Sequence, residues 1–528
     1  MIRRRLAHTR EHDLHRSSVI LEKAQVRRVV IAGGGTAGWI AAAALSHQFH
    51  GIIDITLIES DEIGTVGVGE STIPPIRSFH RLLRIDEQEF MRTTAATFKL
   101  GISFENWGSP GDRYIHPFGV TGKSTWACEF HHFWLHSLKK GFDAEFGEFC
   151  LEHQAALADK FATSPQAEIS YAYHLDAGIY ARFLRKFSEG FGVKRIEGRI
   201  REVKQNSESG FIEALVLDSE QLIEGDLFID CTGFRGLLIE QTLHTGYEDW
   251  NQWLLCDSAV AVQTESTGPA VPYTRSIAHE AGWRWRIPLQ HRVGNGLVYC
   301  SRYMSDQDAT ARLLKEVDGK AIIQPRVIKF RTGRRNRAWN KNVIALGLAS
   351  GFVEPLESTS IHLIMTGVNR LIFMFPFAGV TESLIDQYNE DVRAEAEKVR
   401  DFIILHYKVT EREDTPFWRE CKHMQVPESL QRRIDMFREH AHAWQAEGEL
   451  FRVDSWTHVM FGQRLQPASH NQLPQALPDH DLARLIANIR GTIAGAVERM
   501  PHHQDFLNHY CKAGDDVWAG MKSMQKGV

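Results

Sequence analysis

The sequence contains no long apolar stretch and no excess of basic residues, and each absence excludes a class of protein. No run of about 18 apolar residues occurs, so we expect no transmembrane helix and no membrane partner. Residues 1–25 are rich in Arg and His and lack an apolar core, which argues against a secretory signal peptide. We predict that residues 1–26 form a poorly ordered extension. The formal net charge of -5, without a basic stripe, argues against a nucleic-acid partner.

Cysteine is sparse and unpaired along the chain. None of the seven cysteines belongs to a C-x-x-C pair, so neither a disulfide framework nor a zinc site is indicated. His131 and His132 have no acidic or cysteine partner at ligand spacing, and we expect no metal. Scattered reduced thiols are typical of a cytoplasmic protein, and we predict that location. The seven are Cys128, Cys150, Cys231, Cys256, Cys300, Cys421 and Cys511.

The chain is organised around a glycine-rich turn near its N-terminus. The β-branched residues 29–31 predict a strand, and the alanine-rich residues 40–45 predict a helix. Between them, a G-x-G-x-x-G pattern lets a pyrophosphate approach the backbone at the start of the helix. A second apolar strand ends at Glu59, at the interval that suits an acid on a ribose hydroxyl. We predict a dinucleotide site that contains Gly33, Gly35, Thr36, Ala37, Gly38 and Glu59.

Two later segments indicate that the dinucleotide is FAD. Residues 227–233 and 342–348 predict strands that end in small residues, the second at Gly347. Such returns to the cofactor from distant parts of the chain are expected of a two-part FAD fold and not of a nicotinamide-only fold. Residues 63–75 carry three glycines and a double proline, which predicts a structured loop over the cofactor. From that loop we assign Gly69, Glu70 and Ser71 to the FAD site.

A chain of 528 residues is too long for one ordinary core, so we expect interleaved lobes. We predict an α/β protein with a two-part, Rossmann-like FAD-binding domain of the glutathione-reductase or monooxygenase type and an interleaved, largely helical substrate domain. The FAD-binding domain takes residues 27–76, 177–240 and 326–380. The substrate-binding and helical domain takes residues 77–176, 241–325 and 381–528.

Lys99 is the first candidate catalytic residue. Apolar positions at helical spacing predict a helix from about Ser78 to Lys99, and the neighbours of the lysine are apolar. A lone lysine in such a segment is most often a snorkelling side chain. A lysine held in an apolar pocket is costly, however, and marks a functional site.

Two further segments have patterns that suit a site. Trp283, Trp285 and Ile287 alternate with arginines, which places the three apolar side chains on one face of a strand before Pro288. They form either a core ladder or a wall between a flavin and its substrate. Near residue 358 a helix begins whose amides and dipole suit a small anion. Glu357 at this helix start is either an acid that offsets the dipole or a functional carboxylate.

Together these motifs resemble the flavin-dependent halogenases of the tryptophan halogenase family. The resemblance spans roughly residues 27–425. It rests on G-x-G-x-x-G followed by Trp39, the lysine of Phe98-Lys99, W-x-W-x-I-P at 283–288, P-L-E-S-T at 355–359, and a block that contains Leu-His-Tyr at 405–407, Arg412 and Asp-Thr-Pro-Phe-Trp at 414–418.

The resemblance implies that reduced FAD and dioxygen oxidise chloride or bromide, held near Thr359 and Ser360, to hypohalous acid. The Trp-Trp-Ile wall then keeps the organic substrate from the flavin. Lys99 delivers an electrophilic halogen to an aromatic carbon, either by hydrogen-bonding the oxidant or as a haloamine. Glu357 positions that oxidant or takes the ring proton. By similarity, His116 and Phe118 line the substrate pocket.

The resemblance also implies a partner. Reduced FAD comes from a separate NADH-dependent flavin reductase, because the chain has a single glycine fingerprint. The second partner is a small aromatic substrate. A homodimer is left open.

Two departures from the family pattern concern halide and substrate. Ser360 stands where the family commonly has glycine, with His362 close by, so the choice between chloride and bromide stays open. Residues 426–470 lack the Tyr-Tyr and acidic cluster with which tryptophan halogenases bind the amino-acid backbone, which favours indole or another electron-rich aromatic. Two other functions stay open: a FAD-dependent aromatic monooxygenase, which needs neither Lys99 nor the wall, and a non-catalytic flavin redox sensor.

Overall fold

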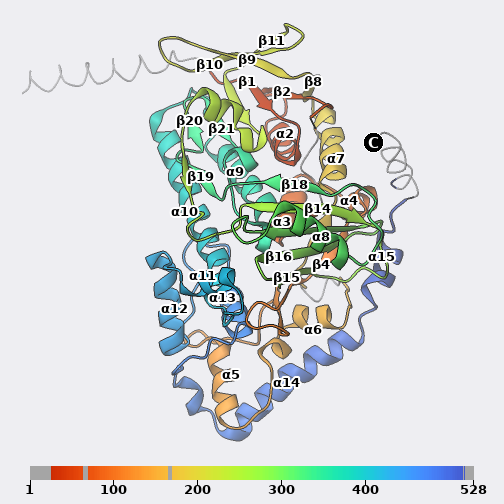
Figure 1. The fold of residues 1–528 in the computed structure, drawn as a ribbon, viewed down its shortest axis with the longest axis vertical. Coiled ribbons are helices and arrows are strands. Elements are labelled where there is room, and N and C mark those ends of the chain that lie inside the picture. The colour runs from red at the N-terminus through yellow and green to blue at the C-terminus, as the bar shows by residue number, and fades with distance from the viewer. Residues whose placement is uncertain (1–24, 64–68, 164–168, 515–516, 518–528) are drawn as a thin grey trace, which may run out of the picture.

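The computed structural model describes residues 25–63, 69–163, 169–514 and 517 and shows two large sheets with helices around them (Figure 1). The predicted N-terminal extension therefore lies almost wholly outside the described residues. The first sheet has the strand order β20-β21-β12-β1-β2-β8, with only the edge strand β20 antiparallel. These strands are β1 Arg28–Ala32, β2 Asp54–Glu59, β8 Lys194–Glu197, β12 Leu227–Asp230, β20 Trp339–Asn340 and β21 Val343–Ala345.

Strand β1 is apolar on both faces because each face has its own covering layer. Val29 and Ile31 lie in the core shared with α2 (Thr36–Gln48), which packs against α7 (Ala177–Gly190) and α9 (Ser360–Phe373). Val30 and Ala32 lie in a second core with the antiparallel strands β9 Ile200–Gln205, β10 Ile212–Leu217 and β11 Leu222–Glu224. A parallel sheet buried on both sides reads as a continuous apolar run, which is what residues 29–31 show.

The second sheet has seven strands in the order β18-β14-β17-β16-β15-β5-β6. Most of this sheet comes from residues 241–325, for which a largely helical domain was predicted, so the helical prediction is wrong there. Residues 382–510 are largely helical, as predicted, and form α10–α15. Alternating side chains in this segment pack in strands rather than helices. The strands are β5 Gly101–Glu105, β6 Arg113–Pro117, β14 Ser258–Thr264, β15 Thr274–His279, β16 Gly282–Pro288, β17 Val293–Tyr299 and β18 Arg326–Lys329.

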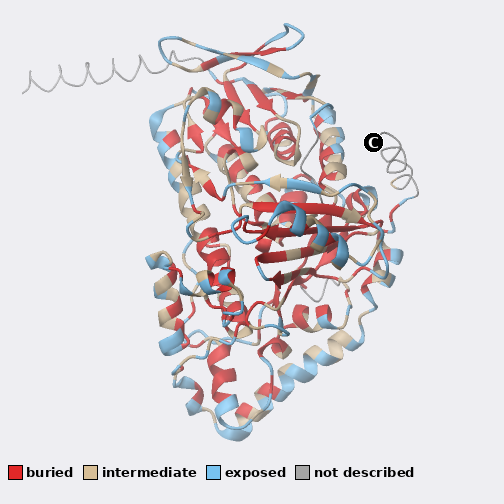
Figure 2. Cartoon of the chain, in the orientation of Figure 1, coloured by how far each residue is buried: buried red, intermediate tan, exposed pale blue. Residues whose placement is uncertain are grey.

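Helix α10 begins beside β20 of the first sheet, whereas α11–α14 lie toward the end of the molecule that is distant from that sheet (Figure 1). Figure 2 shows that the strands of the seven-stranded sheet are mainly buried, whereas α14 is largely exposed. Among the described residues, no helix combines the length and apolar character needed to cross a membrane. The helices are α10 Glu382–Lys408, α11 Pro416–His423, α12 Glu428–His440, α13 Val453–Gly462, α14 Asp479–Glu498 and α15 His503–Tyr510.

The predicted helix from Ser78 to Lys99 is wrong, because the chain turns twice in this segment. It forms α3 (Pro75–Leu82), α4 (Glu87–Thr94) and the strand β4 (Thr97–Lys99). Arg84 and Ala95 adopt left-handed conformations with φ of 56° and 50°, which end the two helices. Lys99 therefore lies on a strand, paired with β7 (Ala172–Leu175).

A side chain caps the helix that begins after residue 176. The carboxylate of Asp176 accepts a hydrogen bond from the backbone N–H of Ile179 at 2.9 Å and begins α7.

Candidate active site

A cavity of about 890 Å³ lies at the carboxyl ends of the parallel strands of the first sheet, where α/β folds bind their ligands. Apart from Gly38, every residue predicted to bind the cofactor lines it: Gly33, Gly35, Thr36, Ala37, Glu59, Gly69, Glu70, Ser71 and Gly347. Cys231, Thr232 and Gly233, from the predicted return of the chain after β12, line it as well.

Three glycines of the turn differ in what a side chain at their positions would contact. A Cβ on Gly38 would lie 1.9 Å from the carbonyl oxygen of Gly33, so Gly38 lets α2 approach the turn. Gly33 itself has φ of 107°, and a Cβ there would lie 2.4 Å from the carbonyl oxygen of Cys231. Gly35 is different, because it has φ of −71° and a Cβ on it would meet no protein atom within 4 Å. Its space opens to the cavity, which fits a pyrophosphate at this backbone.

Gly35→Ala distinguishes an effect on ligand binding from an effect on protein stability. The protein leaves room for the methyl group and its backbone conformation suits alanine, so we expect unchanged thermal stability. We expect the dissociation constant for FAD to rise on the order of tenfold, since the methyl group occupies the space of the pyrophosphate. Fluorescence titration with FAD measures this change. Gly491→Ala, in α14 and equally free of contacts, is the matched control. Unchanged affinity in Gly35→Ala would contradict the placement of the pyrophosphate.

Glu59 is fixed at the edge of the cavity. Its Oε1 accepts a hydrogen bond from Arg195 Nε at 2.5 Å, and its Oε2 accepts one from Trp39 Nε1 at 3.2 Å. Binding of a ribose hydroxyl by this carboxylate stays a prediction, and Arg195 is a partner that sequence analysis missed.

Strand β16 presents three apolar side chains to the cavity, as predicted. Trp283, Trp285 and Ile287 line it, while Arg284 and Arg286 point to the other face and pair with acidic residues. The indole N–H of Trp285 is buried without a hydrogen-bond partner among the described residues. That of Trp283 donates to Glu354 Oε2 at 2.9 Å. Pro288 ends the strand and does not line the cavity.

Lys99 is fully buried, which rules out a snorkelling side chain. Its Nζ donates hydrogen bonds to the carbonyl oxygen of Thr72 at 3.1 Å and to Ser358 Oγ at 2.9 Å, and lies 5.0 Å from the centre of the Phe118 ring. Burial lowers the pKa of Lys99 to about 7, against the opposing effect of Glu357. Ser358 also lines the cavity, so one hydroxyl connects the lysine to the cavity.

Glu357 is buried between two histidines and lies before the first turn of α9, which contains no acidic residue. His116 Nδ1 lies 3.0 Å and 2.9 Å from its two oxygens, and His406 Nε2 lies 2.8 Å from Oε1. Burial raises the pKa of Glu357, but the histidines outweigh it and bring the pKa to about 2. Sequence analysis placed His116 in the substrate pocket and included His406 in the block that resembles the family, but gave it no role at Glu357. The signal for His406 was available, as a lone histidine within an apolar helical run.

At the start of α9, one buried hydroxyl group makes no hydrogen bond to the described residues. Thr359 is the N-cap residue, and its Oγ1 is buried without a hydrogen-bond partner among the described residues. Ser360 opens the helix and lines the cavity. An orphaned donor beside the first amides of a 14-residue helix fits a small anion.

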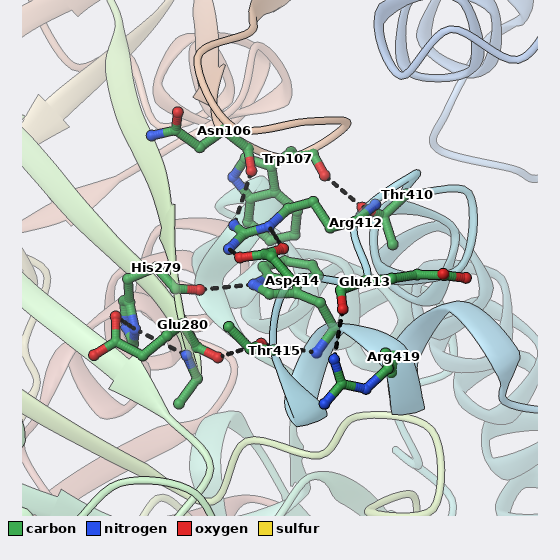
Figure 3. Close-up of polar contacts among 12 residues, drawn as sticks. Asn106, Trp107, His279, Glu280, Thr410, Arg412, Glu413, Asp414, Thr415 and Arg419 are labelled. Atoms are coloured by element: carbon green, nitrogen blue, oxygen red, sulfur yellow. Dashed lines mark hydrogen bonds and ion pairs between the residues drawn. The ribbon is translucent and has the colours of Figure 1, made fainter.

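A polar network holds α11 and the segment that joins it to α10 against the second sheet (Figure 3). Arg412 pairs with both oxygens of Asp414 and donates to the carbonyl oxygen of Asn106 at 2.9 Å. Thr415, the N-cap of α11, donates to the carbonyl oxygen of Glu280, in the turn that precedes β16. Trp418 donates likewise to His279. The network fixes α11 and the segment that follows α10 relative to the turn before β16.

This arrangement agrees with a family model named tryptophan halogenase, which matches residues 28–479. The chain belongs to the tryptophan halogenase family. The family is one of halogenating flavoenzymes, so the protein is a FAD-dependent halogenase that uses a halide, and the monooxygenase and redox-sensor alternatives are set aside. Its chemistry requires a flavin reductase and an aromatic substrate.

Individual relatives support the assignment. The chain is 53% identical to the structure of Xcc4156, a flavin-dependent halogenase from Xanthomonas campestris, with a TM-score of 0.92 over 93% of this chain and 99% of that one. It is 44% identical to BrvH, a flavin-dependent halogenase from Brevundimonas sp. BAL3, with a TM-score of 0.89 over 92% and 99%. It is 38% identical to tryptophan 6-halogenase SttH from Streptomyces toxytricini, over 78% of this chain and 84% of that protein.

The comparisons confirm the predicted family and FAD-binding fold. The seven cysteines, all described, are free thiols. Within the described ranges, no three His, Cys, Asp or Glu side chains are grouped so as to hold a metal ion.

Proposed function

We propose that this halogenase transfers chlorine or bromine to an electron-rich, indole-like aromatic compound through Lys99, with reduced FAD supplied by an NADH-dependent reductase in the cytoplasm. One observation carries the proposal: a buried lysine and a buried carboxylate lie next to the FAD cavity, linked to it through Ser358. Seven unpaired cysteines support the cytoplasmic location.

Each group of residues has a role that follows from its position relative to the cavity. Bound reduced FAD supplies, with dioxygen, the oxidising power that converts halide to hypohalous acid. Thr359 and the first amides of α9 hold the halide beside the cavity. The wall of Trp283, Trp285 and Ile287 keeps the aromatic compound away from the cavity.

Lys99 and Glu357 then act on the substrate side. Because burial lowers the pKa of Lys99 to about 7, a large fraction of the side chain is a neutral amine at neutral pH and is able to take the halogen. Glu357 is ionised there, because its pKa is about 2, and accepts the ring proton. Phe118, against Lys99, provides an apolar surface for an aromatic ring.

The segment after α12 favours a substrate without an amino-acid backbone. Its buried acid, Glu449, is already paired with Arg433 at 2.6 Å and accepts the backbone N–H of Ala446 at 2.7 Å. The Arg433 guanidinium is held in turn over the rings of Trp444 and Trp456. A carboxylate engaged in this way does not bind a substrate ammonium without breaking a buried ion pair. We therefore infer that indole is a better substrate than tryptophan.

Mass spectrometry tests the proposal. The protein is incubated with FAD, a flavin reductase, NADH and either chloride or bromide, with indole or tryptophan as substrate. We expect a product with the halogen isotope pattern, and more of it from indole. A product that gains one oxygen instead, or a clear preference for tryptophan, would contradict the proposal.

Thr359→Val tests the halide site. The substitution keeps the shape of the side chain and removes a hydroxyl that has no partner among the described residues, so we expect unchanged thermal stability. We expect the KM for halide to rise on the order of tenfold, equivalent to one hydrogen bond of about 1.4 kcal/mol. Product formation against halide concentration measures it. Thr94→Val, which removes a buried hydroxyl bonded to its own helix, should leave this KM unchanged. An unchanged KM in Thr359→Val would place the halide elsewhere.

A further inference from the structure

The two ring nitrogens of His406 have partners that fix the position of one proton. Nδ1 lies 2.9 Å from the carbonyl oxygen of Phe402, one turn earlier in α10. A carbonyl oxygen only accepts hydrogen bonds, so Nδ1 carries a hydrogen. In a neutral imidazole the other nitrogen, Nε2, then has a lone pair and no hydrogen.

That second nitrogen lies 2.8 Å from Glu357 Oε1. Nε2 has no aligned hydrogen-bond partner among the described residues, so its contact with the carboxylate is a close approach of two polar atoms and not a hydrogen bond. Two electron-rich atoms at this distance repel each other unless the ring or the carboxyl group carries an additional proton. Because Glu357 is ionised at neutral pH, the additional proton resides on His406, and the pair holds one proton more than a neutral histidine beside a carboxylate.

His116 does not remove the need for this proton. Its Nδ1 faces both oxygens of Glu357, an arrangement that a neutral imidazole satisfies by donating its N–H. The other titratable groups near Glu357 are Lys99 on β4 and Tyr114 on β6. The amide of Gln463 donates to Tyr114 Oη at 3.3 Å and to the His406 carbonyl oxygen at 2.9 Å. Neither Lys99 nor Tyr114 is in hydrogen-bond contact with His406 in the described structure.

We propose that His406 is a positioning residue that shares one proton with Glu357, and that this pair gives the proton to the departing hydroxide during halogen transfer and recovers it from the ring. The inference rests on the proposed function, since it assigns a role within the same site. It explains why a histidine with no exposed surface lies inside α10 at this carboxylate.

The proton balance closes over one turnover. The bond between halogen and oxygen in hypohalous acid breaks with its electron pair left on oxygen, and the pair supplies the proton that makes this hydroxide a water molecule. The halogen, carried by Lys99 or directly, bonds to the ring carbon. The cationic ring then loses its proton to Glu357, which restores the pair. The sum is hypohalous acid and arene to haloarene and water.

The protonation state is measured without turnover. Protein labelled with 15N-histidine is studied by NMR at pH 7.5, without halide or substrate, and the His406 signals are assigned from His406→Gln. We expect both His406 nitrogens to be protonated in the wild type, and only one in Glu357→Gln. A singly protonated His406 in the wild type, with Nε2 free of hydrogen, would overturn the proposal.

His503 provides an internal control. Its Nδ1 likewise lies 2.7 Å from a carbonyl oxygen, that of Ala270, but its Nε2 accepts the backbone N–H of Phe98 at 3.2 Å. This ring must be neutral, and burial lowers its pKa to about 4. Its signals calibrate a neutral, Nδ1-protonated histidine in the same spectrum.

Kinetics give a second, separate readout. In His406→Gln the amide N–H still reaches toward Glu357 but carries no exchangeable charge, so we expect a rate loss of about tenfold to a hundredfold in halogen transfer. The ratio of variant to wild-type rate should rise as the pH falls, because solvent then supplies the proton. A pH-independent ratio would indicate a merely structural role. Loss of product in the wild type would instead refute the proposed function, while the NMR result would stand.

Discussion

Lys99→Ala is expected to abolish halogenation, with a loss of at least about a thousandfold, while FAD still binds. The reason is the position of the amine: it is buried outside the set of residues that line the FAD cavity and joins that set through Ser358. Removing it therefore leaves the FAD site intact and takes away the group that carries the halogen. FAD titration and product analysis measure the two effects separately.

In Lys99→Ala we also expect hypohalous acid to be released into solution as product formation is lost. Halide is still oxidised on the FAD side, so we expect hypohalous acid to escape, and a halogen-sensitive dye in solution detects it. Lys160→Ala is the matched control, because Lys160 also donates two hydrogen bonds, in its case to the backbone carbonyl oxygens of Val497 and Glu498. That variant should retain activity. Product formation by Lys99→Ala at more than a few per cent of the wild-type rate would refute the role of the lysine.

Local patterns predicted which residues come together at the cavity of the first sheet, for a physical reason. The glycine turn, the acid at the end of β2 and the alternation in β16 each follow from the geometry of one strand or one turn. Gly35 and Trp285 accordingly lie where the sequence places them, on the wall of the cavity. A strand fixes which side chains share a face, so short segments carry this information by themselves.

Contacts between distant segments were not predictable in the same way. Helical spacing from Ser78 onward predicted one helix, but the left-handed turns at Arg84 and Ala95 break it and deliver Lys99 on a strand. The histidines of Glu357 come from β6 and from α10, which lie far from it along the chain. The spacing of residues within one segment does not specify which distant segments come into contact, because tertiary packing determines those contacts. The family resemblance named Lys99 and Glu357 as catalytic, and the structure supplies the neighbours that set their protonation.

Glu357→Gln is expected to slow halogenation on the order of a hundredfold without weakening FAD binding. The substitution keeps the size of the side chain and an oxygen that accepts from His116, but the amide cannot take the ring proton. Because the pKa of Glu357 lies near 2, below that of an ordinary carboxyl group, the carboxylate is fully ionised above about pH 4. The relative loss should therefore be constant from pH 6 to pH 9 as far as Glu357 is concerned. Steady-state rates with saturating halide measure it.

Glu354→Gln distinguishes a chemical role from a disturbed core. Glu354 is equally buried, three residues earlier, and accepts hydrogen bonds from Trp283 at 2.9 Å and Tyr407 at 2.5 Å. Burial raises its pKa to about 7, so at pH 6 it is largely a neutral acid that glutamine imitates. We expect little change in that variant at pH 6. Equal losses in the two variants would show that the site tolerates no substitution in this segment, whereas a large loss confined to Glu357→Gln would show that the rate depends on a charge that two histidines hold in place.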